Sequence, residues 1–299
     1  MTQKNNRWLI NLFLVVTIVG FLGFSFFPLL ENILPRFNKS SVASTVPSPQ
    51  GSSSPTNAGL VDLIAQAKGY ELVLQREPDN STALRGLLEI RLQQGDLKGA
   101  IVPLEKLAQV KSEESDYAVL LAQARQQIGD NDAAIQTYRQ ILVTKPGNMN
   151  ALQGLAGLYL QQKRPLAAVG LLQDTLKAAE VTNQAQANAV DIRAVKLLLG
   201  QVYANQKQYD RAIALYDDLT TGDNKDFRPI LAKAVVLQEQ GRNSQAKPLF
   251  DQASNLAPAQ YKDQIQQLAT SKPENSTEPK AAEPAKPDSA TTVSPNVAK

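Results

Sequence analysis

Residues 115–148 read SDYAVLLAQARQQIGDNDAAIQTYRQILVTKPGN, and the arrangement of apolar, small and turn residues in this segment returns every 34 residues along the chain. Gly95 recurs as Gly129, and Ala100 recurs as Ala134. A fixed period of this length is typical of a repeat array, in which each unit buries its apolar face against its neighbours.

A common numbering of places 1 to 34 fits five units, which are residues 81–114, 115–148, 149–182, 193–226 and 227–260. Place 8 is small in most units, and place 20 is alanine in all of them, so two antiparallel helices can approach closely. Place 24 lies one turn after place 20 on the same helical face, and its bulky residue can fill the gap to the next unit. We therefore predict a first helix through about place 14, a polar turn, and a second helix to about place 30.

The predicted turns carry a glycine followed by a side chain that can cap the next helix, as in Gly95-Asp96, Gly129-Asp130-Asn131 and Gly241-Arg242-Asn243. The third unit has Lys163-Arg164-Pro165 instead. Pro103 and Pro248 fall inside second helices, where they predict local kinks. The extra segment Asn183–Ile192 is predicted to lengthen helix ends, because the sequence around it is rich in Ala and Gln.

This pattern resembles the tetratricopeptide repeat family over about 180 of the 299 residues. The resemblance implies an all-α fold, a right-handed solenoid of helical hairpins. One departure is that place 4, where the family usually has a large residue, is never tryptophan in this chain.

The N-terminal region predicts one transmembrane helix. Residues 1–7 are a short polar tail, and Trp8–Leu30 is a run of 23 residues without a charge. A helix of that length crosses a hydrocarbon core of about 30 Å, and Trp8 suits the membrane interface. A cleaved signal peptide is the alternative, since Ser41-Val42-Ala43 is similar to a cleavage site.

The segments around the repeats have their own expected roles. Residues 59–80 match places 24 and 32 at Tyr70 and Pro78, so we expect a half-repeat that caps the array. The solenoid is predicted to span residues 59–270. The other expected segments are a Ser/Pro-rich tether at 31–58, a closing helix at 260–269 and a disordered tail at 271–299.

The amino-acid composition excludes several classes of function. The chain has no histidine and no cysteine, which removes Ser-His-Asp and Cys-His catalysis, disulfides and His-ligated metal sites. Asp217 and Asp218 are adjacent on one helix and point apart, which favours a solvated face over a metal site. The net charge of +3, without a basic face interleaved with aromatics, argues against nucleic acid. We expect no enzyme activity, no cofactor, no metal and no small-molecule substrate.

The resemblance implies that the first helices line a concave groove through places 2, 5, 9, 12 and 13. The candidate partner-binding residues are Arg85, Glu89, Gln93, Val119, Gln123, Gln127, Asn150, Gln153, Gln161, Leu197, Gln201, Asn205, Leu231 and Gln238. An amide-lined groove can hydrogen-bond an extended or helical segment. The alternative is that Gln, a strong helix former, only fills exposed positions. The family's clamp for a terminal carboxylate is not expected, because Glu89 would repel that group.

The predicted function is a membrane-tethered, non-catalytic protein-binding scaffold, an assembly factor or a co-chaperone. The layout resembles single-span tetratricopeptide proteins of bacteria, cyanobacteria and plastids. A structural subunit of a secretion, envelope or photosynthetic complex is the alternative. Lys4 and Arg7 on one side of the apolar run face Arg36 and Lys39 on the other, which slightly favours a cytoplasmic N-terminus. The array would then be periplasmic or lumenal, on an inner, plasma or thylakoid membrane; the reverse orientation places it in cytosol or stroma.

Overall fold

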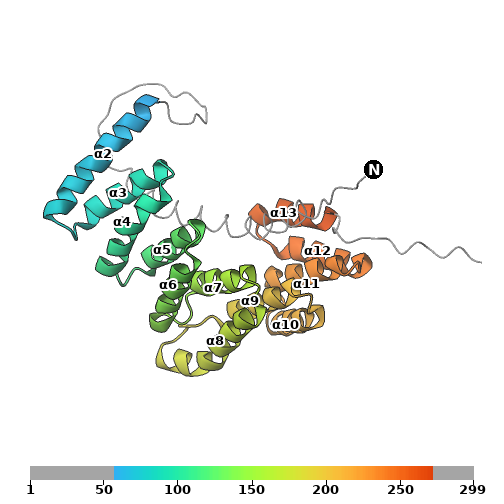
Figure 1. Cartoon of the computed structure of the whole chain (residues 1–299). Helices are drawn as coiled ribbons and strands as arrows, with labels where there is room; N and C mark the ends of the chain where they lie inside the picture. The colour runs from blue at the N-terminus through green and yellow to red at the C-terminus, as the bar shows by residue number, and fades with distance from the viewer. Residues whose placement is uncertain (1–56, 272–299) are drawn as a thin grey trace, which may run out of the picture. The chain divides into compact units, whose positions relative to one another are not determined.

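The computed structural model describes residues 57–271, with side chains from Val61 onward. This part of the chain contains twelve α-helices and no β-strand (Figure 1). The helices are α2 (Asn57–Arg76), α3 (Ser81–Gln93), α4 (Leu97–Val110), α5 (Ser115–Gln127), α6 (Asn131–Thr144), α7 (Met149–Gln161), α8 (Pro165–Ala185), α9 (Ile192–Asn205), α10 (Tyr209–Gly222), α11 (Phe227–Glu239), α12 (Asn243–Leu256) and α13 (Ala259–Thr270).

The predicted transmembrane helix at Trp8–Leu30 lies outside the described residues, as do the tail at 1–7 and all but the first residue of the tail at 271–299. Helix α2 begins at Asn57, so it includes the last two residues of the predicted tether. None of the helices α2 to α13 combines the length and the apolar character that a membrane crossing requires.

The described residues divide into two compact units, with the boundary between Leu158 and Tyr159. Unit 1 holds α2 to α6 and most of α7, and unit 2 holds the end of α7 and α8 to α13. Within each unit a second helix packs against the first helix of its own repeat and the first helix of the next, as α4 does with α3 and α5 (Figure 1). Helix lengths follow the 34-residue register, because α3 covers places 1–13 and α4 covers places 17–30.

Alanine at place 20 lies at the centre of every hairpin. Its exposed fraction is 0% in four repeats and 2% in the fifth, in the order Ala100, Ala134, Ala168, Ala212 and Ala246. At this depth a methyl group is the largest side chain that keeps the two backbones close, because protein interiors have few voids to absorb extra volume. The predicted role of the small residue is confirmed.

The tyrosine at place 24 packs onto the next repeat in unit 1, as the spacing predicts, whereas in unit 2 the ring of Tyr216 also lies against Gly200 of its own repeat. A Cβ atom added to Gly86 would lie 2.3 Å from Cζ of Tyr70, and one added to Gly154 would lie 2.3 Å from Cζ of Tyr138. Both glycines stand at place 6 of the repeat that follows the tyrosine. We call the contact between place 24 of one repeat and place 6 of the next a joint. At these two joints the tyrosine ring therefore occupies the volume that any larger side chain at place 6 would need.

The sequence matches sizes at all five joints. Where place 24 is tyrosine, place 6 of the next repeat is glycine or alanine, and where place 24 is leucine, place 6 is leucine. The pairs in chain order are Tyr70/Gly86, Leu104/Leu120, Tyr138/Gly154, Leu172/Leu198 and Tyr216/Ala232. Leu104 and Leu120 belong to one buried cluster formed by α3, α4 and α5. A large residue thus faces a small one, or two residues of middle size face each other, at every joint.

A polar contact accompanies several joints, between place 25 of one repeat and place 11 of the next. Arg91 donates to Glu71 at 2.6 Å, and Arg125 forms the equivalent ion pair with Glu105. In unit 2 the same places hold Gln173, which donates to the hydroxyl of Tyr203 at 3.1 Å. An ion pair in unit 1 and a neutral hydrogen bond in unit 2 thus connect the same two places. These pairs reinforce the register of neighbouring repeats.

The turn between the two helices of a repeat adopts a left-handed backbone at place 15. Glycine occupies this place three times, with φ of 69° at Gly95, 87° at Gly129 and 75° at Gly241. Lysine occupies it in the other two repeats, and both Lys163 and Lys207 have φ of 58°. A side chain in this region costs on the order of 1 kcal/mol relative to glycine.

The helix caps differ between repeats. Asp96 accepts from the backbone N–H of Gly99, and Asp130 accepts from that of Ala133, as the turn sequences predict. The prediction of a side-chain cap is wrong at the last turn, because α12 begins after Arg242, which makes no side-chain cap bond. An arginine side chain has donors only, so it cannot accept from a helix N-terminus.

The extra segment between the third and fourth repeats only partly lengthens a helix. Helix α8 continues to Ala185, but Gln186–Asp191 is not helical. The side chain of Asn183 closes this loop, because its Nδ2 donates to Val190 O at 2.9 Å and its Oδ1 accepts from Val190 N at 2.8 Å. Helices α4 and α12 continue through their internal prolines.

The size match at the joints can be tested at Tyr138/Gly154. Gly154→Leu is expected to lower the free energy of unfolding by about 2–3 kcal/mol, because the new side chain overlaps the ring of Tyr138. Adding Tyr138→Leu should recover most of the loss, since it recreates the Leu104/Leu120 pair. Urea unfolding of the full chain, followed by circular dichroism, gives the comparison.

Gly170→Ala is the matched control, because a Cβ atom there meets nothing within 4 Å. It should leave stability unchanged or raise it by about 0.5–1 kcal/mol, because alanine favours the helix and its methyl group meets no neighbour. A double variant no more stable than Gly154→Leu alone would show that volume at the joint is not the constraint.

Candidate functional site

The predicted partner-binding residues lie on the first helices of the repeats, and we call their solvent-facing side the first-helix face. In unit 1 this face belongs to α3, α5 and the unit 1 part of α7; in unit 2 it belongs to the end of α7, to α9 and to α11. Places 5 and 9 are four residues apart, and places 12 and 13 follow place 9 by three and four residues, so all of them lie toward one side of a helix.

In unit 1, Arg85 is half-buried rather than fully extended into solvent. Its Nε donates to Ser81 O at 3.2 Å, and its side chain hydrogen-bonds the phenol of Tyr117. Burial raises the pKa of Tyr117, and the positive charge of Arg85 opposes that rise. On the same helix Glu89 accepts from Nε2 of Gln93 at 3.2 Å.

Val119 is fully buried, with an exposed fraction of 0%. Its predicted place on the binding surface is wrong, because place 5 sits at the margin of the core. A long polar side chain such as Arg85 reaches out from this place, whereas a short apolar one is covered by its neighbours. The other residues predicted at place 5, Gln153, Leu197 and Leu231, are half-buried.

Gln123 has a buried acceptor. Its Oε1 atom is shielded from solvent and accepts no hydrogen bond from the described residues. An unpaired buried polar atom costs about 1–3 kcal/mol, so a donor that reached it would be stabilised. The amide also lies on the first-helix face, between Val119 and Gln127, so rotation of its side chain would present the oxygen to a bound segment.

The amides at place 13 form the most exposed part of the face. Gln93 and Gln127 are exposed in unit 1, and Gln161 and Asn205 are exposed in unit 2. Gln201, four residues before Asn205, is exposed as well, whereas Asn150 is half-buried. Each of the first four repeats thus presents at least one side chain that can both donate and accept a hydrogen bond.

Gln238 is already engaged within the chain. Its Nε2 donates to the carbonyls of Leu268 at 3.2 Å, Ala269 at 3.4 Å and Ser271 at 2.9 Å. It therefore caps the C-terminal end of α13, whose carbonyls have no partner within their own helix. A partner segment that used this amide would have to displace α13.

The charged groups on the face of unit 2 are unevenly placed. Burial by its neighbours raises the pKa of Glu239, and the charge of Lys207 opposes the rise. At the start of α11 a hydrogen bond from the Arg228 side chain lowers the pKa of Asp226. Asp226 also forms an ion pair with Arg193 at 3.6 Å, so the charges at the start of α11 largely neutralise one another.

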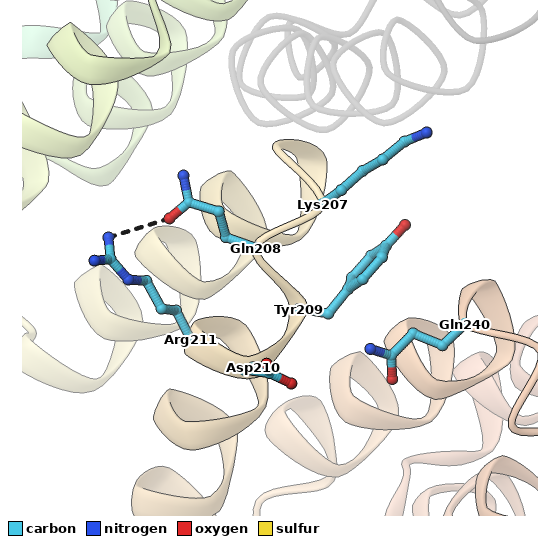
Figure 2. Close-up of a pocket in the computed structure, with 6 residues that line it drawn as sticks. All are labelled: Lys207, Gln208, Tyr209, Asp210, Arg211 and Gln240. Carbon is cyan, nitrogen blue, oxygen red and sulfur yellow. Dashed lines mark hydrogen bonds between the residues drawn. The ribbon is translucent and has the colours of Figure 1, made fainter.

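The structure adds a feature that sequence reasoning missed, at the turns between first and second helices in unit 2. Residues Lys207 to Arg211 and Gln240 line a hollow of about 280 Å³ (Figure 2). The available signal was the register itself, because Lys163 and Lys207 stand where the other repeats have glycine. Among residues 57–271 no group of three or more acidic side chains is placed to hold a metal ion.

Comparison with known families identifies the repeats. Models described as tetratricopeptide repeat match residues 127–190 and residues 172–227. Both matches cover helical hairpins whose alanine and bulky places follow the register described above. Residues 127–227 therefore match tetratricopeptide repeat models, in agreement with the sequence pattern.

Two curated proteins show the extent of the similarity. The chain is 30% identical over 189 residues to the protein SLOW GREEN 1, chloroplastic, of Arabidopsis thaliana, which is 63% of this chain and 58% of that protein. It is 30% identical over 127 residues to the cellulose synthase operon protein C of Escherichia coli, which is 40% of this chain and 11% of that protein. The chain thus spans under two thirds of each relative.

Solved structures with similar helical repeats include a tetratricopeptide repeat protein from Parabacteroides merdae, at 18% identity and a TM-score of 0.45. That match covers 70% of this chain and 84% of the other. Another is YrrB, described as having an unusual peptide-binding site, at 13% identity and a TM-score of 0.38. It covers 67% of this chain and 98% of the other.

The buried acceptor of Gln123 can be tested by stability. Gln123→Leu removes a polar atom that has no partner, so the free energy of unfolding should stay constant or rise by about 1 kcal/mol. Urea unfolding measures the change, with Gln136→Leu at an exposed position of α6 as the control. A clear loss of stability at Gln123 would show that the amide is satisfied within the chain and is not poised for a ligand.

Proposed function

We propose that this protein is a membrane-tethered, non-catalytic scaffold or assembly factor whose first-helix faces bind segments of partner proteins. The observation that carries the proposal is the exposed amide at place 13 in four successive repeats, Gln93, Gln127, Gln161 and Asn205. A segment of polypeptide offers one donor and one acceptor per residue, and amides can pair with both.

The uncharged character of the row suggests how specificity arises. Uncharged amides attract a partner only at short range. The choice between partner segments therefore depends on pairing the polar groups that become buried in the complex. The unpaired Oε1 of Gln123 adds to this selection, because only a partner with a donor at the right point relieves its cost. Repeats then act together, each contributing a small part of the binding energy.

The tether belongs to the proposal through the sequence of residues 8–30, an uncharged apolar run long enough to cross a bilayer. Anchoring the repeats raises their effective concentration near membrane-borne partners. The chloroplastic relative from Arabidopsis supports a photosynthetic membrane as the setting. We propose a single-pass inner, plasma or thylakoid membrane protein with the repeats on the periplasmic or lumenal side.

A crosslinking series tests the binding face. A photo-reactive amino acid placed at Gln93 or Gln127 of the full chain should crosslink a defined partner protein in native membranes. The same group at Gln136, exposed on a second helix, should give no such product. Equal amounts of crosslinked product from all three positions would show that the first helices are not the binding surface. A partner that crosslinks at a fixed stoichiometry would favour the alternative that the protein is a structural subunit.

Membrane attachment is a separate prediction. The full chain is expected to remain in the membrane pellet after alkaline carbonate extraction, because an apolar segment of this length is not released by loss of protein contacts. A variant lacking residues 8–30 should appear in the supernatant. Protease digestion of sealed vesicles then reports the side of the repeats, and release of the unaltered chain by carbonate would contradict the anchor.

A further inference from the structure

One edge of unit 2 carries a set of positive side chains. Within unit 2 the repeat register brings the turns between first and second helices to one edge, which we call the turn edge. Its cations are Lys163, Arg164, Lys207, Arg211 and Arg242. All five side chains are exposed, and Asp210 is the one carboxylate among the residues that line the hollow.

These charges are not neutralised within the described chain. None of the five forms an ion pair, whereas the cations of unit 2 that do so lie elsewhere: Lys177, Arg193, Lys196, Arg228 and Lys233. Glu239 is near enough for Lys207 to affect its titration, but the two do not make an ion pair. None of the five cations of the turn edge therefore has a carboxylate in ion-pair contact within the described residues.

The arginines are held by neutral groups. The guanidinium of Arg164 lies 5.2 Å from the ring centroid of Tyr159, and that of Arg211 lies 5.5 Å from the ring centroid of Tyr203. Arg211 also donates to Oε1 of Gln208 at 3.1 Å, the bond drawn in Figure 2. Such contacts fix the orientation of a cation without cancelling its charge, which lowers the entropy lost when an anion binds.

The last turn repeats this arrangement with amides. Arg242 donates to Oε1 of Gln240 at 3.0 Å and to Oε1 of Gln245 at 2.6 Å. Gln240 also borders the hollow, where Figure 2 shows it on the turn that neighbours Lys207 and Tyr209. An ammonium group, a phenol and an amide therefore border one depression, and each can donate a hydrogen bond.

Two lysines of this edge stand at positions where glycine would be conformationally easier. Place 15 needs a left-handed backbone, and glycine meets that need without cost in the other three repeats. In unit 1 the neighbouring capping residues are Asp96 and Asp130, whose carboxylates bind their own helix N-termini. Unit 2 has Arg164, Gln208 and Arg242 at those caps, so the edge gains positive charge and loses negative charge.

We propose that the turn edge of unit 2 binds an acidic segment of a partner polypeptide. Its cations follow the line of the turns, which suits an extended chain with spaced carboxylates. Asp210 would repel a continuous phosphate surface such as nucleic acid or an anionic membrane, but it can accept a hydrogen bond from a peptide N–H. The surface is separate from the first-helix face, so the two proposals can fail independently.

The test uses the full chain in nanodiscs of neutral phosphatidylcholine and a fluorescein-labelled oligoglutamate peptide, with oligoglutamine as the uncharged probe. Fluorescence anisotropy should show binding of oligoglutamate only, and the affinity should fall between about 50 and 200 mM salt. Lys163→Gly/Lys207→Gly should weaken binding about fivefold, because each exposed charge pair contributes on the order of half a kcal/mol. Glycine is already the residue at this place in three repeats, so the variant keeps the turn.

Lys225→Gln/Lys262→Gln is the matched control, since it removes two lysines of unit 2 that make no ion pair and lie outside the turn edge. It should change the affinity less than twofold, and Gln93→Ala/Gln127→Ala should leave it unchanged. The proposal is overturned if the native chain does not bind oligoglutamate, or if both lysine pairs weaken binding equally. Loss of peptide binding in nanodiscs of anionic phosphatidylglycerol would overturn the proposal in favour of a membrane as the ligand of this edge. Self-association of the chain that requires Lys163 and Lys207 would overturn it in favour of a second copy of the chain.

Discussion

Every repeat depends on the contact between its two helices at place 20, where alanine is buried in all five units. With a larger side chain there, the helices would separate and the residues at place 24 would no longer reach the next repeat. The joints are therefore secondary to the hairpin: Tyr70 fits against Gly86, and Leu104 shares a cluster with Leu120, only because each second helix lies close to its partner. The place 11 and place 25 polar pairs then reinforce contacts that packing has already set.

This hierarchy explains where the functional groups lie. Places that face the core or a joint cannot vary without a compensating change, so chemical variety is confined to the first-helix faces and the turns. In unit 1 the turns retain the glycine and aspartate that favour stability. In unit 2 lysine and arginine replace them at Lys163, Arg164 and Lys207, which raises the energy of the turn and changes its charge. Proteins often accept local strain at positions that have a binding role.

Much of the fold was predictable because the period of the pattern is long and several copies agree. Alanine at place 20 and the bulky residue at place 24 are visible in the sequence, and the helices begin and end close to the expected places. The face was less predictable. Val119 was expected on the surface, but the depth of place 5 depends on the neighbouring helices and not on local spacing. Gln238 was expected to meet a partner, whereas it binds carbonyls of α13 that lie about thirty residues away. Tertiary contacts of this kind leave no local signal.

The alternation of joint types has a consequence for how such an array can change in length. Tyrosine and leucine joints alternate along the chain, so the true structural period is two repeats. Removing residues 115–148 alone would set Leu104 above Gly154 and leave a void, because neither side chain fills the space of a ring. Removing residues 81–148 would set Tyr70 above Gly154, a pair of the kind already present. A change in length by two repeats thus preserves the joint types, and a designer who lengthens the array should insert repeats in twos.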